Sequence, residues 1–167
     1  KPMTSEHLLH TIPPIYDRNS KILILGSFPS VKSREVSFYY GHPQNRFWRV
    51  LAAVLGCAVP SSNEEKTALL HSHNIALWDI IKSCDIVGSS DSSIKNVVPN
   101  DIGTILSSCG IRQIYSNGKT SEKLFNKYIK DTVGRDTVAL PSTSPANASY
   151  NLERLTDSWS VIKNNIR

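Results

Sequence analysis

Four short apolar runs alternate with amphipathic segments along the chain. Residues 22–25 read Ile-Leu-Ile-Leu, a continuous apolar run that is typical of a strand buried on both faces of a parallel sheet. Similar runs occupy residues 75–80, 113–117 and 137–140. A helical pattern follows each of the first three runs, and another follows the segment that comes after the fourth run. We therefore predict an α/β fold. Its architecture would be a three-layer α/β/α domain with a central four-stranded parallel sheet.

The amphipathic segments predict helices between the strands. From Asn45 to Gly56 the apolar residues Phe47, Val50, Leu51 and Val54 lie on one helical face, and Gly56 ends the helix. Helices are also expected from the Ser62-x-x-Glu65 capping box to residue 73, from Asp101, and from Gly118 through residue 129. The clearest period, at three and four residues, belongs to Leu152, Leu155, Trp159, Ile162 and Ile166.

Two segments with candidate chemistry come directly after predicted strands. They are residues 26–45, which begin with a turn at Gly26-Ser27-Phe28-Pro29-Ser30, and residues 141–147. The carboxyl ends of parallel strands meet at one edge of a sheet, where ligands bind in open α/β folds. We therefore expect both segments to face the same cleft.

Length and charge narrow the class of protein. At 167 residues the chain suits a single domain, residues 1–167, in which residues 1–20 form an extended lead-in. The formal net charge of +5 suits a polyanionic partner. No apolar run approaches the length of about 20 residues that spans a bilayer, and the amino end is polar, so we expect no membrane partner and a soluble, intracellular protein of the cytoplasm or nucleus.

The cysteines and histidines favour no metal site. The three cysteines are widely spaced and form no C-x-x-C pair, which argues against a disulfide framework, a structural zinc site and a four-cysteine iron–sulfur cluster. His7 and His10 have helical spacing, but no third ligand of a suitable type lies nearby, so a solvated pair is favoured. We expect neither a metal nor another cofactor.

The segment Phe38-Tyr39-Tyr40-Gly41-His42-Pro43-Gln44-Asn45-Arg46-Phe47-Trp48 is unusually rich in aromatic rings and polar groups for a surface loop. Tyr40 can stack on a planar heterocycle, and Asn45 can contact a base edge or position a water molecule. Asn45 also stands where a helix is expected to begin, where an amide caps the backbone and N–H groups favour an anion.

These motifs together resemble the uracil-DNA glycosylase superfamily, and most closely its hypoxanthine-DNA glycosylase branch. The resemblance rests on GSFPS at 26–30, FYYGHPQNRFW at 38–48 and LPSTSPANA at 140–148, with Trp78-Asp79-Ile80 and Ser116-Asn117-Gly118 in order between them. It implies a monofunctional DNA glycosylase of base excision repair, acting as a monomer on DNA that contains a deaminated base, with hypoxanthine as the expected base. No lysine stands in a motif position suited to a Schiff base, which argues against strand cleavage.

The resemblance also implies the residues of the site. Asn45 would be catalytic, with His42 as a second candidate. Ser27, Phe28, Tyr40 and Asn117 would bind the base: Tyr40 by stacking, and Ser27 and Phe28 through backbone N–H groups that accept its developing charge. Phe28 departs from the pattern of the superfamily, which commonly has Asp or Asn there. A phenyl ring cannot handle water, so the catalytic polar group must lie elsewhere. Asp79, at a strand end, can act electrostatically or as a structural hydrogen-bonding group.

Contacts to DNA are expected from the two loops. The residues implied are Ser30, Ser142, Ser144, Pro145, Ala146 and Asn147, with an electrostatic share from Lys32, Arg34, Lys119 and Lys123. Ala146 and Asn147 are small for side chains that fill the gap left by a flipped base, which predicts dependence on base pairs that are already weak.

Three alternatives remain open. Uracil in mismatches is the main competing substrate, because pocket depth decides between purines and pyrimidines. A lesion-binding protein that keeps the fold without catalysis is favoured by Phe28 in the first motif. A serine hydrolase is disfavoured, because the chain lacks a G-x-S-x-G elbow and a convincing Asp/His pair.

Overall fold

The computed structural model describes residues 4–88 and 90–167 and contains the four strands expected from the sequence. These are β2 (Ile22–Gly26), β3 (Ile75–Asp79), β6 (Gln113–Asn117) and β7 (Thr137–Leu140). They pair in parallel in the order β3-β2-β6-β7. The predicted four-stranded parallel sheet is confirmed.

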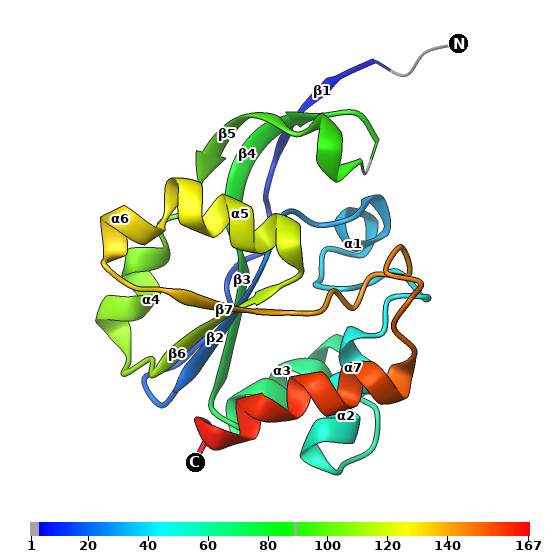
Figure 1. Cartoon of the computed structure of the whole chain (residues 1–167), viewed down its shortest axis with the longest axis vertical. Helices are drawn as coiled ribbons and strands as arrows, with labels where there is room; N and C mark the ends of the chain where they lie inside the picture. Colours follow the sequence, from blue (N-terminus) through cyan, green and yellow to red (C-terminus); the bar gives the residue numbers. More distant parts are fainter. Residues whose placement is uncertain (1–3, 89) are drawn as a thin grey trace.

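Helices cover both faces of this sheet (Figure 1). One face carries α2 (Phe47–Leu55), α3 (Asn63–Ser72) and α7 (Leu152–Trp159), and the other carries α4 (Ile102–Ser108), α5 (Lys119–Tyr128) and α6 (Lys130–Val133). Ile22 and Ile24 pack into the first layer, whereas Leu23 and Leu25 pack into the second. Burial on both faces explains why residues 22–25 are apolar without alternation.

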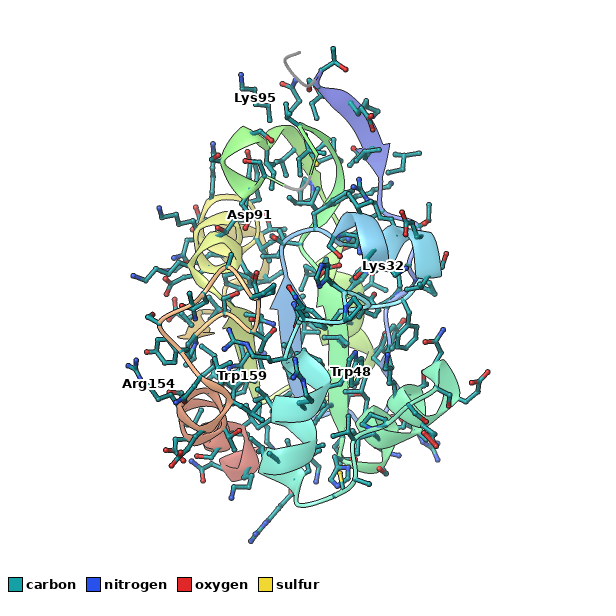
Figure 2. The ribbon with its side chains drawn as sticks, turned by 90° about the vertical axis from the view of Figure 1, so that its right-hand side faces the viewer. Lys32, Trp48, Asp91, Lys95, Arg154 and Trp159 are labelled. Atoms are coloured by element: carbon teal, nitrogen blue, oxygen red, sulfur yellow. The ribbon has the colours of Figure 1, made fainter. Side chains whose placement is uncertain are left out.

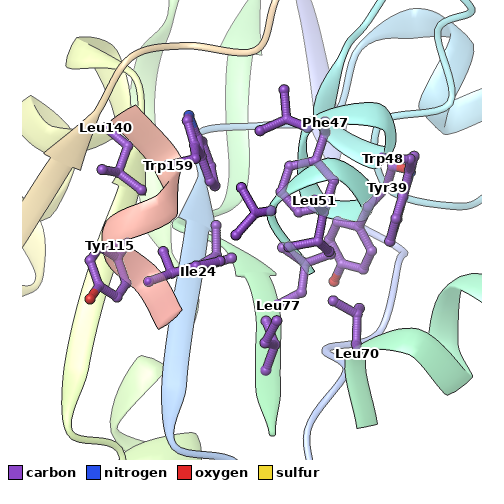
Figure 3. Close-up of a cluster of buried hydrophobic side chains, with 14 of the residues drawn as sticks. Ile24, Tyr39, Phe47, Trp48, Leu51, Leu70, Leu77, Tyr115, Leu140 and Trp159 are labelled. Atoms are coloured by element: carbon purple, nitrogen blue, oxygen red, sulfur yellow. The ribbon is translucent and has the colours of Figure 1, made fainter. Parts of the chain in front are cut away.

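The first of these layers holds the larger aromatic core. Phe47 and Leu51 of α2 and Trp159 of α7 meet Ile24 and Leu77 of the sheet there (Figure 3). The Phe47 ring packs edge-on against Trp159, with 5.8 Å between ring centroids. This packing fixes the beginning of α2 against the sheet, next to the end of β2.

A second sheet was not predicted from the sequence. It is antiparallel, with the order β1-β4-β5, and lies at the top of Figure 1: β1 (Glu6–Leu9), β4 (Ile81–Ile86) and β5 (Lys95–Pro99). β4 begins two residues after the end of β3. β1 belongs to the predicted lead-in, and Ile15 of the same segment makes a bridge to Leu77. The amino-terminal segment is thereby fastened to both sheets.

Smaller differences concern the helices. The short helix α1 (Val31–Val36), capped by Ser30, was not expected between β2 and the aromatic segment. The carboxyl-terminal helix changes after Trp159 to the 3₁₀ helix η2 (Ser160–Asn164), and Leu152 is exposed rather than buried. In the Gly/Ser/Asp-rich segment 88–93, Asp91–Ser93 form the 3₁₀ turn η1, while Ser89 lies outside the described residues. Within the described ranges, every helix is too short or too polar to cross a bilayer.

Candidate active site

Three strands of the parallel sheet end side by side, and two of them end in polar side chains. Asp79 of β3 pairs with Gly26 of β2, and Asn117 of β6 follows Ser116, which pairs with Leu25. The loops after β2 and β7 leave from the same edge. The N–H of Arg46 donates to the carbonyl of Thr143 at 3.0 Å, so the two motif segments are in contact, as the sequence predicts.

One side of this edge is a hydrogen-bonded group of four residues, which we call the Thr143 cluster: Asn45, Arg46, Asn117 and Thr143. Asn117 donates its amide N–H to the Thr143 hydroxyl at 3.0 Å and accepts the Thr143 backbone N–H at 3.0 Å. The Thr143 hydroxyl in turn donates to Asn45 Oδ1 at 2.9 Å. Thr143 is fully buried, so this chain of bonds is shielded from water.

The Thr143 cluster fixes the orientation of the Asn45 amide. Asn45 Oδ1 accepts both the Thr143 hydroxyl and, at 2.9 Å, the backbone N–H of Phe47, the first residue of α2. Asn45 thus lies near the start of the helix, as predicted, but the N-cap residue is Arg46, whose side chain makes no capping bond. Asn45 Nδ2 makes no hydrogen bond within residues 4–88 and 90–167. The amide therefore presents two N–H donors, and no acceptor, to the outside of the cluster.

Arg46 holds the loop after β7 in place. Its guanidinium donates to the carbonyls of Ser144, Asn147 and Tyr150, and its Nε donates to that of Thr143. Trp159 adds a further anchor through its Nε1–H, which donates to the carbonyl of Pro141 at 2.9 Å. Only backbone carbonyls accept these bonds, so the path of the loop depends on them and not on the side chains that it carries.

The other side of the edge is the Asp79 cluster, formed by His10, Asp79 and Tyr40. His10 Nε2 lies 2.8 Å from Asp79 Oδ2, and the two side chains are 1% and 5% exposed. His10 comes from the segment after β1, and its ring lies 6.0 Å from the Phe28 ring and 6.2 Å from the Tyr39 ring. The expected solvated pair of His7 and His10 is therefore wrong for His10, which is buried against a carboxylate; His7 is exposed and pairs with Asp85.

Tyr40 is the third member of the Asp79 cluster. Its ring stacks on Phe47 with 4.1 Å between centroids, and its φ of 52° places a non-glycine residue in the left-handed region, which costs about 1–3 kcal/mol. The hydroxyl is buried and makes no hydrogen bond with any described residue. Burial, and then the negative charge of Asp79, raise the pKa of Tyr40 far above its usual value, and the nearby Asn117 amide lowers it in part. The hydroxyl therefore stays protonated.

The remaining residues expected to act on the base are less concentrated. His42 is exposed and lies in a turn, where its Nδ1 accepts the Gln44 N–H at 3.1 Å. The Phe28 ring turns toward the second sheet, packing on its apolar cluster and under the Arg34 guanidinium. Ser27 accepts the N–H of Ile81 through its carbonyl, so the turn after β2 is tied to the start of β4.

The residues expected to contact DNA lie in two turns. Ser30 caps α1 by accepting the Ser33 N–H. Ser142 accepts the Ser144 N–H and Ser144 accepts the Ala146 N–H, so both hydroxyls shape the loop, while Asn147 donates to the Ser142 carbonyl. Pro145 and Ala146 are exposed at its tip. Figure 2 looks onto the face that carries α1, α2 and this loop, with Lys32 on α1 and Arg154 on α7 on opposite sides.

Sequence analysis missed the roles of three residues. Arg46 and Thr143 stand inside the quoted motifs, so their position was a signal, but their partners are about 100 residues away along the chain. His10 carried no signal, because its partner Asp79 is 69 positions distant and the strand just before it belongs to the unexpected second sheet. Within the described residues, no group of three or more His, Cys, Asp or Glu side chains is arranged to hold a metal ion.

The oriented asparagine and the buried carboxylate lie at the carboxyl edge of a parallel sheet, where ligands bind in open α/β folds. The chain matches the family model of the uracil DNA glycosylase superfamily over residues 13–164. It therefore belongs to the uracil DNA glycosylase superfamily.

Individual relatives agree with this membership. The chain is 35% identical over 137 residues to a protein of Methanosarcina barkeri named hypoxanthine DNA glycosylase, covering 81% of this chain and 85% of the relative. A protein of the same name from Methanosarcina acetivorans is 34% identical over 152 residues, covering 90% and 94%. A solution NMR structure from M. acetivorans, solved as a candidate uracil DNA glycosylase, superposes with a TM-score of 0.78 at 32% identity, covering 91% of this chain and 94% of that one.

Proposed function

We propose that this protein is a monofunctional DNA glycosylase that hydrolyses the N-glycosidic bond of hypoxanthine in DNA, as a step of base excision repair. The observation that carries the proposal is the oriented Asn45 amide at the edge where the motif loops meet. Superfamily membership and two relatives named hypoxanthine DNA glycosylase support the substrate.

The orientation of Asn45 suggests its chemical role. Bond cleavage leaves positive charge on the sugar and negative charge on the departing base, and fixed donors aimed at developing negative charge lower the barrier. An amide cannot deprotonate water at neutral pH, but its free N–H groups donate to the departing base or hold the attacking water. The bond from Thr143 prevents the amide from turning its oxygen outward.

Further contacts are proposed for the other residues of the edge. Ser27, Phe28, Tyr40 and Asn117 bind the base, and His42, exposed beside Asn45 in the same turn, is the second candidate for proton sharing. The loops bring Ser30, Ser142, Ser144, Pro145, Ala146 and Asn147 to DNA. Because the tip of the loop at Pro145 and Ala146 is small and exposed, it fills little of the gap left by the base, so weak base pairs should be preferred.

The proposal also covers the form in which the protein acts. We propose a single glycosylase domain, residues 1–167, working as a monomer without metal or cofactor, inside the cell where its DNA substrate lies. Light scattering of the protein with and without a lesion duplex tests the monomer, and base release in the presence of EDTA tests the independence from metal.

Base release from matched duplexes tests the function itself. The duplexes carry hypoxanthine, uracil, xanthine or no lesion, and wild type is compared with Asn45→Ala at saturating enzyme. Release of hypoxanthine that falls steeply in the variant, without loss of DNA binding, is the expected result. Preferential release of uracil would support the alternative to which the NMR relative points. Binding without any release would indicate a lesion-binding protein that lacks catalysis.

A further inference from the structure

One of the two carboxylate oxygens of Asp79 has a hydrogen-bond partner among the described residues, and the other has none. Its Oδ2 accepts a hydrogen bond from His10 Nε2, which must carry the proton because a carboxylate only accepts. Its Oδ1 makes no hydrogen bond with any described residue, although the side chain is only 5% exposed. The side chain keeps a small exposed area, so this oxygen is open to a hydrogen-bond donor that arrives with a ligand.

The free oxygen of Asp79 and the hydroxyl of Tyr40 face the same point. That point lies above Gly26, the last residue of β2: a Cβ placed there would be 2.3 Å from Asp79 Oδ1 and 3.0 Å from the Tyr40 hydroxyl oxygen. Only glycine leaves both atoms in place. The edge of the sheet therefore holds an unpaired acceptor beside an unpaired donor.

The neighbouring Tyr39 provides a comparison, because it is also buried but its hydroxyl is hydrogen-bonded. Tyr39 donates its hydroxyl to the carbonyl of Pro13 at 2.8 Å, whereas the Tyr40 hydroxyl has no partner within the part of the chain that the structure describes. Leaving a buried hydroxyl unpaired is unfavourable, and the strained backbone of Tyr40 adds to the cost. A donor kept unpaired at this cost is expected where its partner arrives with the substrate.

An acceptor beside a donor is the complement of a lactam edge, an N–H next to a C=O. Hypoxanthine presents N1–H and O6, and uracil presents N3–H and O4. Their parents adenine and cytosine present the opposite order, a ring nitrogen acceptor beside an amino donor. Enzymes that act on a flipped base recognise it by hydrogen bonds to this Watson–Crick edge.

We propose that Asp79 Oδ1 accepts the lactam N–H of the excised base while the Tyr40 hydroxyl donates to its C=O, and that His10 is the residue that positions Asp79. This assignment rests on the proposed function and gives Tyr40 the edge of the base rather than its face. Adenine would place its ring nitrogen lone pair against the carboxylate and its amino group against the hydroxyl. A site built on hydrogen bonds discriminates strongly against such a mismatch.

Single-turnover base release by Tyr40→Phe tests the assignment, with Tyr39→Phe as the matched control. Each variant removes one buried hydroxyl. Tyr40→Phe should release hypoxanthine about tenfold more slowly while the melting temperature stays the same or rises, because an unpaired hydroxyl is lost. Tyr39→Phe should lower the melting temperature by about 2–4 °C and leave the rate unchanged, because a paired hydroxyl is lost.

The substrate supplies the second half of the test. A duplex carrying unsubstituted purine lacks both N1–H and O6, so Tyr40→Phe and wild type should release purine at equal rates. Asp79→Asn should slow hypoxanthine release about 100-fold, because a charge-assisted bond is lost, and His10→Gln should slow it less, because glutamine can still donate to Asp79.

Equal slowing of both substrates by Tyr40→Phe, or of neither, would overturn the assignment. If Asp79→Asn fails to fold, the two-substrate comparison for Tyr40→Phe still decides. A wild type that releases uracil but not hypoxanthine contradicts the proposed function alone, and the lactam contact is then judged on the uracil duplex. A wild type that releases no lactam base contradicts both.

Discussion

The two sides of the site differ in how fully their polar groups are paired. In the Thr143 cluster, hydroxyl, amide and guanidinium groups bond to one another and to the backbone, and the Asn45 N–H₂ has no partner among residues 4–88 and 90–167. In the Asp79 cluster, one carboxylate oxygen and one hydroxyl have no partner among the described residues. A paired network holds a shape, whereas unpaired buried groups await a ligand. The first side thus positions the Asn45 amide, which we propose to be catalytic, and the second is where we expect the base to be recognised.

The largest effect is expected when the outward-facing N–H donors of Asn45 are replaced by a hydrogen-bond acceptor. Asn45→Asp keeps the size of the side chain but replaces the two N–H donors with a carboxylate oxygen, which repels the departing base. Single-turnover release of hypoxanthine should fall about 100- to 1,000-fold, the range for loss of one fixed donor to developing charge. Asn45→Ser, which retains a small donor, is the control, and an unchanged rate in Asn45→Asp would exclude the donor role.

A smaller loss is expected when the Asn45 oxygen loses one of its two partners. Thr143→Val keeps the shape of the buried side chain but leaves Asn45 Oδ1 with only the bond from the Phe47 N–H and leaves Asn117 Nδ2 without its bond, which should lower the free energy of unfolding by about 1–3 kcal/mol. The rate should fall about tenfold, since the amide can then turn. Thr143→Ser restores the hydroxyl and should restore the rate; a rate equally low in Ser and Val would point to packing instead.

Next in size is the anchor of the loop. Arg46→Lys keeps the charge but cannot reach the carbonyls of Ser144, Asn147 and Tyr150 together. We expect weaker binding to a lesion duplex, by about three- to tenfold, and faster proteolysis between residues 141 and 150. Arg49→Lys, on the exposed side of α2, is the matched control and should change neither quantity.

The smallest effect is expected at the tip of the loop. Ala146→Leu adds an apolar side chain at an exposed position without touching the anchored backbone. If this residue enters the gap left by the base, the dissociation constant for the abasic product should fall by about two- to fivefold, and fully paired duplexes should become better substrates. An identical change at exposed Ala148 serves as the control, and an equal effect there would argue against insertion.

Local patterns were sufficient for the parallel sheet and for most of its helices. Residues 22–25 are buried on both faces, so their unbroken apolar run identified a strand, and the αL conformation of Gly56 ends α2 where the sequence suggested. The second sheet was not predicted because β1 and β5 are largely exposed and β1 pairs with β4, which is distant along the chain. Register of that kind is set by tertiary contacts rather than by the pattern of one strand.

For the site, the convergence of the loops was predictable from the sequence, but the pairing of its buried side chains was not. Asn45, Asn117 and the residues 141–147 were expected to converge, because parallel strands end at one edge, and Thr143 joins them. The burial of His10 on Asp79 was not predictable, since it needs the path of an irregular segment between the two sheets. Nor could a sequence pattern show that the Tyr40 hydroxyl, unlike that of Tyr39, lacks a partner.

The dependence of the loop after β7 on Arg46 has a consequence for protein engineering. Because the guanidinium binds only main-chain oxygens, the path of the loop should tolerate many different side chains. Libraries that randomise the side chains at 145, 146 and 148 should preserve the anchoring while varying the grip on DNA. The same catalytic edge could thus be given tighter or looser product release, so turnover and lesion search could be tuned separately from bond cleavage.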